Sequence, residues 1–375
     1  MINYLDNAAT SYPKPPSVIR AMERCMEERG GNPGRGSHRL ALLASEKLFE
    51  ARSLLCELFS SDDPEGVAFT MNTTYALNLA ILGLINEGDH VIISDMEHNS
   101  VLRPVEWLKR YKGIEYSVFS TRGDACESIR SLIRKNTRAV ICSHASNITG
   151  RLLPVGDIGR VTREHGVLFI VDAAQSGGLC KTDMKKSCID VLCVPSHKGL
   201  LGPQGIGAAI FAGDILPRAV ITGGSGALSR DADMPPYLPD RLEAGTLPTP
   251  TAAGLCEGIR YVMRRGEASI AAFEAGIIRK ISEDFADDKR ICSYGDAGGG
   301  IWLFNVRGVP SQKVSELLDR KGICTRPGLH CAPLAHKTLG TPEDGAVRVS
   351  AGPLTRPWQA DHFVRSLREI LDGEL

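Results

Sequence analysis

The sequence predicts an α/β protein: a large domain with a mostly parallel sheet flanked by helices, and a smaller α+β C-terminal domain. Short apolar runs alternate with helical patterns over the first two thirds of the chain, and after about residue 250 this alternation ends. Continuous apolar strands separated by helices are typical of a parallel sheet covered on both faces. With 375 residues, the chain is long enough for two domains.

The large domain is expected over residues 15–250. Its predicted strands are the apolar runs at residues 66–70, 89–93, 138–143, 167–172 and 190–194. The predicted helices between them cover residues 74–84, 127–135 and 155–165. In the first of these helices, apolar residues recur at the spacing of one helical face: Ala76, Leu77, Ala80, Ile81 and Leu84.

The small domain is expected over residues 251–375, with residues 1–14 packing nearby. Helical patterns cover residues 252–265, 269–285, 311–321 and 359–371. Strand-like runs cover residues 300–306 and 346–350. Strands and helices do not alternate regularly here, which is typical of an α+β domain.

The composition is that of a globular protein with a formal net charge of zero. Lys and Arg together number 44, as do Asp and Glu. The chain therefore has no overall electrostatic attraction to nucleic acid or acidic membranes. The N-terminus lacks the basic and apolar segments of a signal peptide, and no apolar run approaches the roughly 20 residues that span a bilayer. We therefore expect a cytoplasmic protein that binds neither nucleic acid nor membranes.

The 11 cysteines indicate neither a disulfide framework nor a metal site. Their number is odd, none forms a CxxC pair, and no Cys/His cluster has the spacing of zinc ligands. Most are expected to be buried free thiols, such as Cys142 and Cys193 inside apolar runs, which suits a reducing cytosol. We expect no metal.

A polar cluster follows each predicted strand, which is where ligands bind in parallel sheets. The clusters are Thr73-Thr74, Glu97-His98-Asn99, residues 143–147, Asp172 and Ser196-His197-Lys198. Because the carboxyl ends of parallel strands meet at one edge of a sheet, their recurrence predicts a single binding site.

Lys198 and Asp172 are the candidates for covalent binding and charge pairing. Lys198 precedes the glycine-rich segment 199–205, and a lysine whose pKa is lowered can form a Schiff base. The alternative is a solvated surface lysine. Asp172 ends an apolar strand and needs a partner, either a protonated pyridine nitrogen or, as an N-cap, the backbone that follows.

His98 and the pair Thr73-Thr74 could also contact a ligand. His98 could stack on a planar ring or shuttle a proton, or it could simply bond to backbone in a loop. Thr73-Thr74 opens a helix whose free N–H groups attract anions such as phosphate. An ordinary N-cap threonine fits the same position.

Cys331 and Arg348 lie in the predicted small domain. Cys331 follows His330 in a polar loop that also carries Arg326, and neighbouring positive charge lowers the pKa of a thiol. The alternative is one more unreactive cysteine. Arg348 lies between apolar residues and is expected to pair with an anion, either a substrate carboxylate or a structural Asp or Glu.

Together these motifs resemble the class V aminotransferase family of fold-type I pyridoxal-phosphate (PLP) enzymes. Within it, the sequence is most similar to the cysteine desulfurases and selenocysteine lyases. The resemblance runs from Tyr4-Leu5-Asp6-Asn7 to Arg348-Val349-Ser350. The motifs between are Gly34-Arg35-Gly36-Ser37-His38, Asn72-Thr73-Thr74, Glu97-His98-Asn99-Ser100, Ser146-Asn147-Ile148-Thr149-Gly150, Val171-Asp172-Ala173-Ala174-Gln175, His197-Lys198 and Arg241-Leu242-Glu243-Ala244-Gly245-Thr246.

The resemblance implies pyridoxal 5'-phosphate as the cofactor. Lys198 would bind it as a Schiff base and then move the α-proton of the substrate. The remaining cofactor contacts would be Asp172 at the ring nitrogen, Gln175 at the phenolic oxygen, His98 on the ring face, and Thr73, Thr74, Ser196 and His197 at the phosphate. Thr246 would reach the phosphate of a second subunit, which implies a homodimer with active sites at the interface.

The resemblance also implies a small amino-acid substrate, cysteine or selenocysteine. Its contacts would come from Arg348, Asn147, Arg326 and His38. Cys331 would attack the substrate sulfur and carry it as a persulfide, with alanine as the other product. The loop around Cys331 resembles the short catalytic loops that often pass sulfur to a partner protein.

Two departures from the family pattern concern the cofactor and the loop. Pro195 stands where the family usually has Ser or Thr, three residues before the lysine. Either Ser196 takes over the phosphate contact from one position later, or one phosphate contact is missing. Pro327 and Leu329 replace residues that are commonly small or polar, which would stiffen the loop or change the substrate.

Several activities share these residues. The principal prediction is a cysteine desulfurase that uses Cys331. One alternative is a selenocysteine lyase, and another is a PLP-dependent C–S lyase, epimerase or aminotransferase in which Cys331 is not the nucleophile. A sulfur-carrier scaffold that binds PLP only for structure would leave Lys198, Asp172 and His98 without a role.

Overall fold

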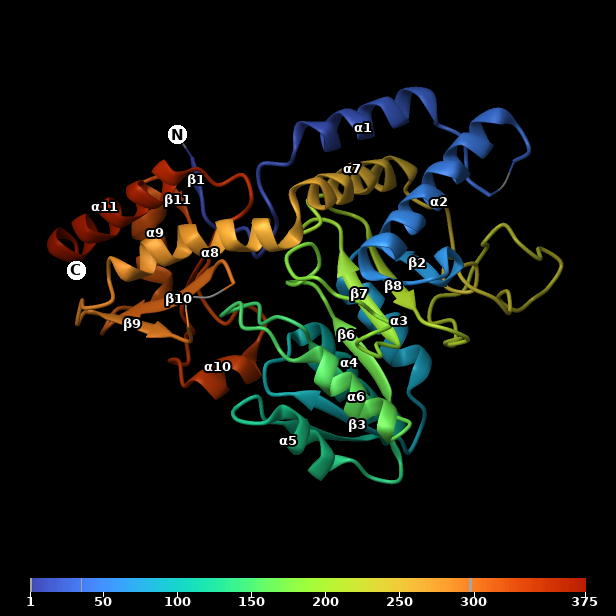
Figure 1. Ribbon diagram of the computed structural model, residues 1–375, viewed down its shortest axis with the longest axis horizontal. Helices are drawn as coiled ribbons and strands as arrows, with labels where there is room; N and C mark the ends of the chain where they lie inside the picture. Colours follow the sequence, from blue (N-terminus) through green and yellow to red (C-terminus); the bar gives the residue numbers. More distant parts are fainter. Residues whose placement is uncertain (1, 35, 297–298) are drawn as a thin grey trace.

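The computed structural model describes residues 2–34, 36–296 and 299–375. A seven-stranded sheet of order β2-β8-β7-β6-β5-β3-β4 forms the centre of the larger body, at the right of Figure 1. Its strands are β2 (Val67–Thr70), β3 (His90–Ser94), β4 (Glu115–Phe119), β5 (Thr137–Ser143), β6 (Leu168–Asp172), β7 (Val191–Pro195) and β8 (Gly207–Phe211). β8 runs antiparallel to both its neighbours, so the other strands all end at the same edge.

Helices cover both faces of this sheet because its strands are apolar on both sides. Every residue of β3, β7 and β8 is buried. One core cluster joins the sheet to α2, α5, α6 and α7, and another joins it to α3 and α4. The helices are α1 (Pro16–Glu28), α2 (Arg39–Phe59), the 3-10 helix η1 (Pro64–Gly66), α3 (Thr73–Leu84), α4 (Asn99–Lys112), α5 (Ala125–Leu132), α6 (Val155–Glu164) and α7 (Thr249–Arg265).

The smaller body, at the left of Figure 1, contains both chain ends. An antiparallel sheet of order β12-β10-β9 lies beside the parallel pair β1-β11. A core cluster containing Trp302 and Phe304, whose stacked rings are 4.2 Å apart between centroids, fills it. The elements are β1 (Asn3–Tyr4), α8 (Glu267–Glu283), β9 (Ile291–Tyr294), β10 (Ile301–Val306), α9 (Ser311–Arg320), β11 (Ile323–Cys324), α10 (Pro333–Leu339), β12 (Val347–Ser350) and α11 (Pro357–Gly373).

The core clusters suggest a domain boundary later than residue 250. Leu255 and Ile259 of α7 belong to the same cluster as α2 and the large sheet. Ile278 of α8 belongs instead to the cluster of Trp302. We therefore propose that the domains meet at Gly266, between α7 and α8, with residues 1–14 joined to the small domain through β1.

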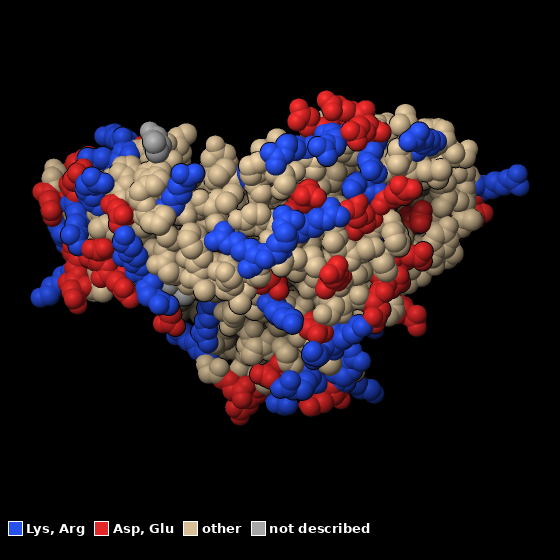
Figure 2. All heavy atoms as spheres, turned by 45° about the horizontal axis from the view of Figure 1, so that its top comes forward, with Lys and Arg blue, Asp and Glu red and all other residues tan. Residues whose placement is uncertain are grey.

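The predicted α/β architecture is confirmed, with a mostly parallel sheet flanked by helices and a separate antiparallel sheet. Cys142 and Cys193 are buried free thiols, as expected. Within the described residues, no helix is both long and apolar enough to span a bilayer. Figure 2 shows basic and acidic side chains on both bodies, in keeping with the net charge of zero.

Candidate active site

The carboxyl ends of the parallel strands surround a cavity of about 250 Å³. Each predicted polar cluster contributes to its lining. The lining residues include Thr73, Thr74, His98, Ser143, Asn147, Asp172, Gln175, His197 and Lys198. No three His, Cys, Asp or Glu side chains of the described chain cluster in a way that could hold a metal ion.

Lys198 follows β7 directly and is held in place by the N-terminal segment. Ser11 N and Lys14 Nζ both donate to the carbonyl oxygen of His197, each at 2.9 Å. Burial lowers the pKa of Lys198 to about 8, although the Asp172 carboxylate opposes the shift. A lysine with a lowered pKa is more often the free amine, which is the form that condenses with an aldehyde.

Glycines on two loops let the Lys198 turn approach its neighbour closely. A Cβ at Gly199 would lie 2.3 Å from the Gly177 carbonyl oxygen. One at Gly178, whose φ is +84°, would lie 2.5 Å from the Gly199 carbonyl oxygen. Larger residues would therefore push the two loops apart and move Lys198 away from the strand ends.

Asp172 ends β6 with its carboxyl group buried, at 4% exposure. It accepts a hydrogen bond from Ala174 N at 2.8 Å, as its alternative role as an N-cap predicted. Burial raises its pKa, while the Ala174 bond and Lys198 lower it. Because the carboxyl group still lines the cavity, a cationic ligand such as a protonated pyridine nitrogen would stabilise its charged form.

His98 caps α4 and is held by Ser100, a residue of the Glu97-His98-Asn99-Ser100 motif for which no role was predicted. Its Nδ1 accepts a hydrogen bond from Ser100 N at 3.1 Å and lies 2.8 Å from Ser100 Oγ. Ser100 Oγ in turn lies 2.8 Å from Thr74 Oγ1. Burial lowers the pKa of His98 to about 4, so the ring is neutral with its proton on Nε2.

Two polar atoms of the cavity lining residues, Thr73 Oγ1 and His197 Nδ1, are buried without a hydrogen-bond partner in the described chain. An unpaired buried polar group costs about 1–3 kcal/mol. The Thr73 hydroxyl, the His197 imidazole and the N-terminus of α3 form a donor set that fits a phosphate. Ser196 Oγ is also unpaired among the described residues, but Ser196 is not part of the cavity lining, and its Oγ faces Gly202, where an added Cβ would lie 2.1 Å from it.

Arg348 of β12 is buried and pairs with a structural acid, one of the two partners left open by the sequence. Its side chain is 1% exposed, and Nη2 lies 2.9 Å from Asp6 Oδ1. Nη1 donates to the Asn147 carbonyl oxygen at 2.8 Å, and Nε has no partner in the described chain. Arg326 forms a β-bridge with Arg348. The guanidinium therefore lies next to Asn147, at the cavity lining.

Cys331 is exposed in a loop that is bonded to the cavity wall. Asn99 N, next to His98, donates to the Cys331 carbonyl oxygen at 2.7 Å. Asn147 Nδ2 donates to the His330 carbonyl oxygen at 2.8 Å. Gln175, which also lines the cavity, donates through Nε2 to the Ala8 carbonyl oxygen at 3.0 Å.

Two predicted site residues lie apart from the cavity of the same chain. His38 is exposed at the start of α2, where its Nδ1 accepts from Ala41 N at 3.4 Å. Thr246 is exposed and lines a separate groove with Met71 and Tyr75. Arg35 of the predicted motif lies outside the described residues.

Glu97 is completely buried, a placement that was not predicted from the sequence. It accepts hydrogen bonds from Ser143 N at 2.9 Å and Ser143 Oγ at 3.0 Å, joining the ends of β3 and β5. Burial raises its pKa to about 8. A carboxyl group three residues after the buried strand that ends at Ser94 was the signal that could have found it.

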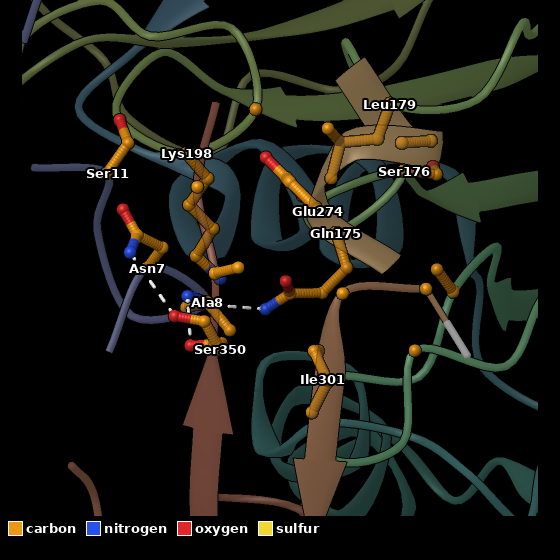
Figure 3. A pocket seen from close by; sticks show the side chains of 18 of the residues that line it. Asn7, Ala8, Ser11, Gln175, Ser176, Leu179, Lys198, Glu274, Ile301 and Ser350 are labelled. Carbon is orange, nitrogen blue, oxygen red and sulfur yellow. Dashed lines mark hydrogen bonds between the residues drawn. The ribbon is translucent and has the colours of Figure 1, made fainter. Parts of the chain in front are cut away.

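A second cavity, of about 80 Å³, shares Lys198 and Gln175 with the first and extends toward the small domain. Figure 3 shows Glu274 of α8 in the lining of this cavity, together with Lys198 and Gln175. Glu274 is 5% exposed, and burial raises its pKa to about 8. Its position in a helical pattern gave no sign of this burial.

Comparison with known proteins gives the family. The profile described as "Aminotransferase class-V" matches residues 3–362. A probable cysteine desulfurase of Pyrococcus abyssi is 32% identical over 98% of this chain and 94% of its own length, and one of Methanothermobacter thermautotrophicus is 34% identical over 92% and 89%. The apo structure of a cysteine desulfurase from Thermococcus onnurineus superimposes with a TM-score of 0.89, at 30% identity, over 99% of this chain and 95% of that one. The chain therefore belongs to the class-V aminotransferase family.

Proposed function

We propose that this protein is a PLP-dependent cysteine desulfurase that converts L-cysteine to L-alanine and takes up the sulfur on Cys331 as a persulfide. The observation that carries the proposal is the connection of two features. One cavity collects Lys198, Asp172 and His98 with an anion-binding set, and the loop of Cys331 is hydrogen-bonded to the wall of that cavity. The cysteine desulfurases found as relatives support the same activity.

The donor set fits pyridoxal 5'-phosphate residue by residue. Lys198 would bind the aldehyde carbon, Asp172 the ring nitrogen and Gln175 the phenolic oxygen. His98, neutral through burial, would stack on the ring. The phosphate would be held by Thr73, Thr74 and His197, which all line the cavity. When bound, PLP supplies an electron sink for charge that develops at the substrate's α-carbon.

The protein's own groups then handle the proton and the substrate carboxylate. Lys198, whose pKa is lowered to about 8, is suited to take a proton from the α-carbon and return one during the same turnover. Arg348 and Asn147 would hold the substrate carboxylate, with Arg326 alongside. Asp6 would then orient the Arg348 guanidinium through their 2.9 Å contact.

Cys331 supplies the nucleophile for the sulfur. Its sulfur bonds to the sulfur of the substrate as the C–S bond of cysteine breaks, and a proton is delivered to the carbon that is left. Cysteine and one protein thiol thus become alanine and one protein persulfide, so atoms and electrons balance without an added oxidant. Because Cys331 is exposed, the persulfide is open to an acceptor thiol or an acceptor protein.

We also infer a homodimer in which Thr246 and His38 complete the site of the other subunit. Both residues are exposed and lie apart from the cavity of their own chain. The groove around Thr246 carries exposed apolar side chains, such as Met71 at 58% and Ile221 at 47%. Exposed apolar groups of this kind are typical of surfaces that are covered by a partner. A cytoplasmic location stays a prediction.

The test is product analysis of the holoenzyme with cysteine and a thiol reductant. The wild type is expected to form alanine and sulfide in equal amounts. Cys331→Ser is expected to lose both while retaining the cofactor, and Cys324→Ser, a partly buried thiol of the same domain, to retain both. Undiminished sulfide release by Cys331→Ser, with pyruvate in place of alanine, would establish the C–S lyase alternative. Alanine formation from selenocysteine but not cysteine would establish the selenocysteine lyase.

A further inference from the structure

The turn that presents Cys331 has an unfavourable backbone conformation. His330 and Cys331 have φ values of +50° and +57°, in the left-handed region. This region costs a residue with a side chain roughly 1–2 kcal/mol. Two successive residues of this kind persist only where the surroundings hold them in place.

The His330 side chain is the innermost part of this turn. It is 3% exposed, and its Nε2 lies 2.9 Å from the carbonyl oxygen of Arg326. Its Nδ1 lies 3.2 Å from Nε2 of His336, on α10. Nδ1 of His336 lies 2.8 Å from Thr341 Oγ1. The four residues form one chain of hydrogen bonds behind Cys331.

The carbonyl at one end of this chain determines the direction of every bond. A carbonyl oxygen only accepts, so His330 Nε2 must carry a proton and donate it. In a neutral ring, Nδ1 of His330 is then an acceptor, and His336 Nε2 must donate to it. His336 Nδ1 must accept in turn, so the Thr341 hydroxyl is the donor at the far end.

Both rings are neutral. Burial lowers the pKa of His330 to about 3, with Arg348 adding to the effect, and burial lowers that of His336 to about 4. The two ring planes are within 13° of each other, with 5.5 Å between the centroids, so the rings lie edge to edge, as the bond between their nitrogens requires. Thr341 is therefore the hydroxyl that completes the chain, because it supplies the donor that His336 Nδ1 requires when the Arg326 carbonyl fixes both tautomers.

We propose that His336 and Thr341 are positioning residues for Cys331: their hydrogen-bond chain fixes the His330 ring and through it the left-handed turn that aims the thiol at the substrate. The inference rests on the proposed role of Cys331 as the sulfur acceptor. Neither residue touches the cavity that contains Lys198. The effect therefore belongs to sulfur transfer and leaves cofactor binding untouched.

The experiment compares two substitutions of similar size at one position. Thr341→Val keeps the shape and removes the hydroxyl, whereas Thr341→Ser keeps the hydroxyl. Thr338→Val is the control, since Thr338 lies in α10 but outside the chain of bonds. Persulfide formation on Cys331, kcat, KM for cysteine and the absorption of the bound cofactor are measured on each holoenzyme.

Thr341→Val is expected to lower kcat and the rate of persulfide formation by about 10- to 100-fold, the scale of a small misplacement of a reacting group. KM and cofactor absorption should stay within twofold of the wild type. Thr341→Ser should recover most of the rate, and Thr338→Val should match the wild type. A purely structural role for this position would leave the serine variant, which loses a methyl group, no better than the valine variant.

His336→Phe keeps a ring but removes both nitrogens, so it tests the same chain if Thr341→Val does not fold. A wild-type rate in either folded variant, or equal loss in the valine and serine variants, overturns the inference. Cys331→Ser in the same assay separates the two proposals. If that variant is inactive while Thr341→Val is fully active, the positioning role fails alone; if Cys331→Ser is itself fully active, the desulfurase proposal fails.

Discussion

Burial, more than pairing, sets the charge of the ionisable side chains around the two cavities. It lowers the pKa of Lys198 to about 8 and that of His98 to about 4. It also raises the pKa of both Glu97 and Glu274 to about 8. The site thus contains a lysine near the balance between its two forms and a neutral histidine, which are the states that covalent binding and ring stacking require.

The first prediction at this scale concerns Lys198. The holoenzyme is expected to show the absorption band of cofactor bound to a lysine, near the border of the visible and ultraviolet ranges. Lys198→Ala removes the amine and should lose this band and all alanine formation. Lys181→Ala, at an exposed lysine, should keep both. An unchanged spectrum in Lys198→Ala would mean that another amine binds the cofactor.

The second prediction concerns Glu274 and the pH dependence of stability. Its pKa of about 8 in the folded protein lies above the ordinary value of 4.5, so the folded state keeps a proton that the unfolded state releases. The free energy of unfolding of the wild type should therefore fall as the pH rises between these values, by a few kcal/mol from this group. Glu274→Gln should lack this part of the decrease.

Urea unfolding of the holoenzymes at pH 5 and pH 8 measures this difference. Glu283→Gln, at an exposed position of the same helix, is the matched control and should follow the wild type. Identical pH dependence in the wild type and Glu274→Gln would show that Glu274 is ionised in the folded protein.

At the scale of elements, the sequence predicted most strands and helices that build the site, because each shows its own local pattern of apolar residues. The predicted helix over residues 74–84 appears as Thr73–Leu84, and the predicted strand over 167–172 as Leu168–Asp172. β8 was not predicted. A short apolar run does not show that a strand pairs antiparallel with both of its neighbours, as β8 does with β2 and β7. The polar side chains at the strand ends could also be predicted, because they directly follow those apolar runs in the sequence.

The parts of the site that escaped prediction depend on contacts between distant residues. Arg348 meets Asp6 across 342 positions of the sequence, and Asn147 meets His330 across 183. Glu97 and Ser143 are joined only because β3 and β5 are neighbours in the sheet. No local pattern specifies such partners, so the sequence could name Arg348 as paired without choosing its partner.

A third prediction tests the close approach of the two glycine loops. Gly199→Ala would place a methyl group 2.3 Å from the Gly177 carbonyl oxygen. We expect the free energy of unfolding to fall by about 1–3 kcal/mol, and cofactor affinity to fall with it, because Lys198 adjoins the displaced loop. Gly276→Ala, in the middle of α8 with open space around it, should instead gain about 0.5–1 kcal/mol. Equal cofactor affinity in Gly199→Ala and the wild type would contradict this account of the turn.

At the scale of the whole molecule, the two predicted domains and the proposed second subunit would meet at the candidate active site. The Cys331 loop reaches the cavity through Asn99 and Asn147, while Lys198 is held by the N-terminal segment. The sequence predicted two domains from a change of pattern, yet α7 packs with the large domain although it follows residue 250. Its amphipathic pattern shows that one face is buried, but not which core it joins.

A fourth prediction tests the shared active site of the dimer. Thr246→Asp would bring a carboxylate toward the cofactor phosphate of the other subunit and should lower activity by charge repulsion. Mixed dimers of Lys198→Ala and Thr246→Asp chains, isolated with two different tags, would contain one intact site. They should recover roughly half of the wild-type rate, whereas each variant alone stays inactive or slow. A mixed dimer no better than the two parents would place Thr246 outside the partner's site.

The central claim is that sulfur leaves cysteine for Cys331 at a cofactor bound to Lys198. The most direct measurement is the mass of the peptide that contains Cys331, after one turnover with cysteine and without reductant. We expect this peptide to gain one sulfur atom, in the same amount as the alanine formed, in the wild type but not in Lys198→Ala. Alanine formed without added sulfur on Cys331, or equal sulfur on Cys331 in the Lys198→Ala protein, would contradict the account.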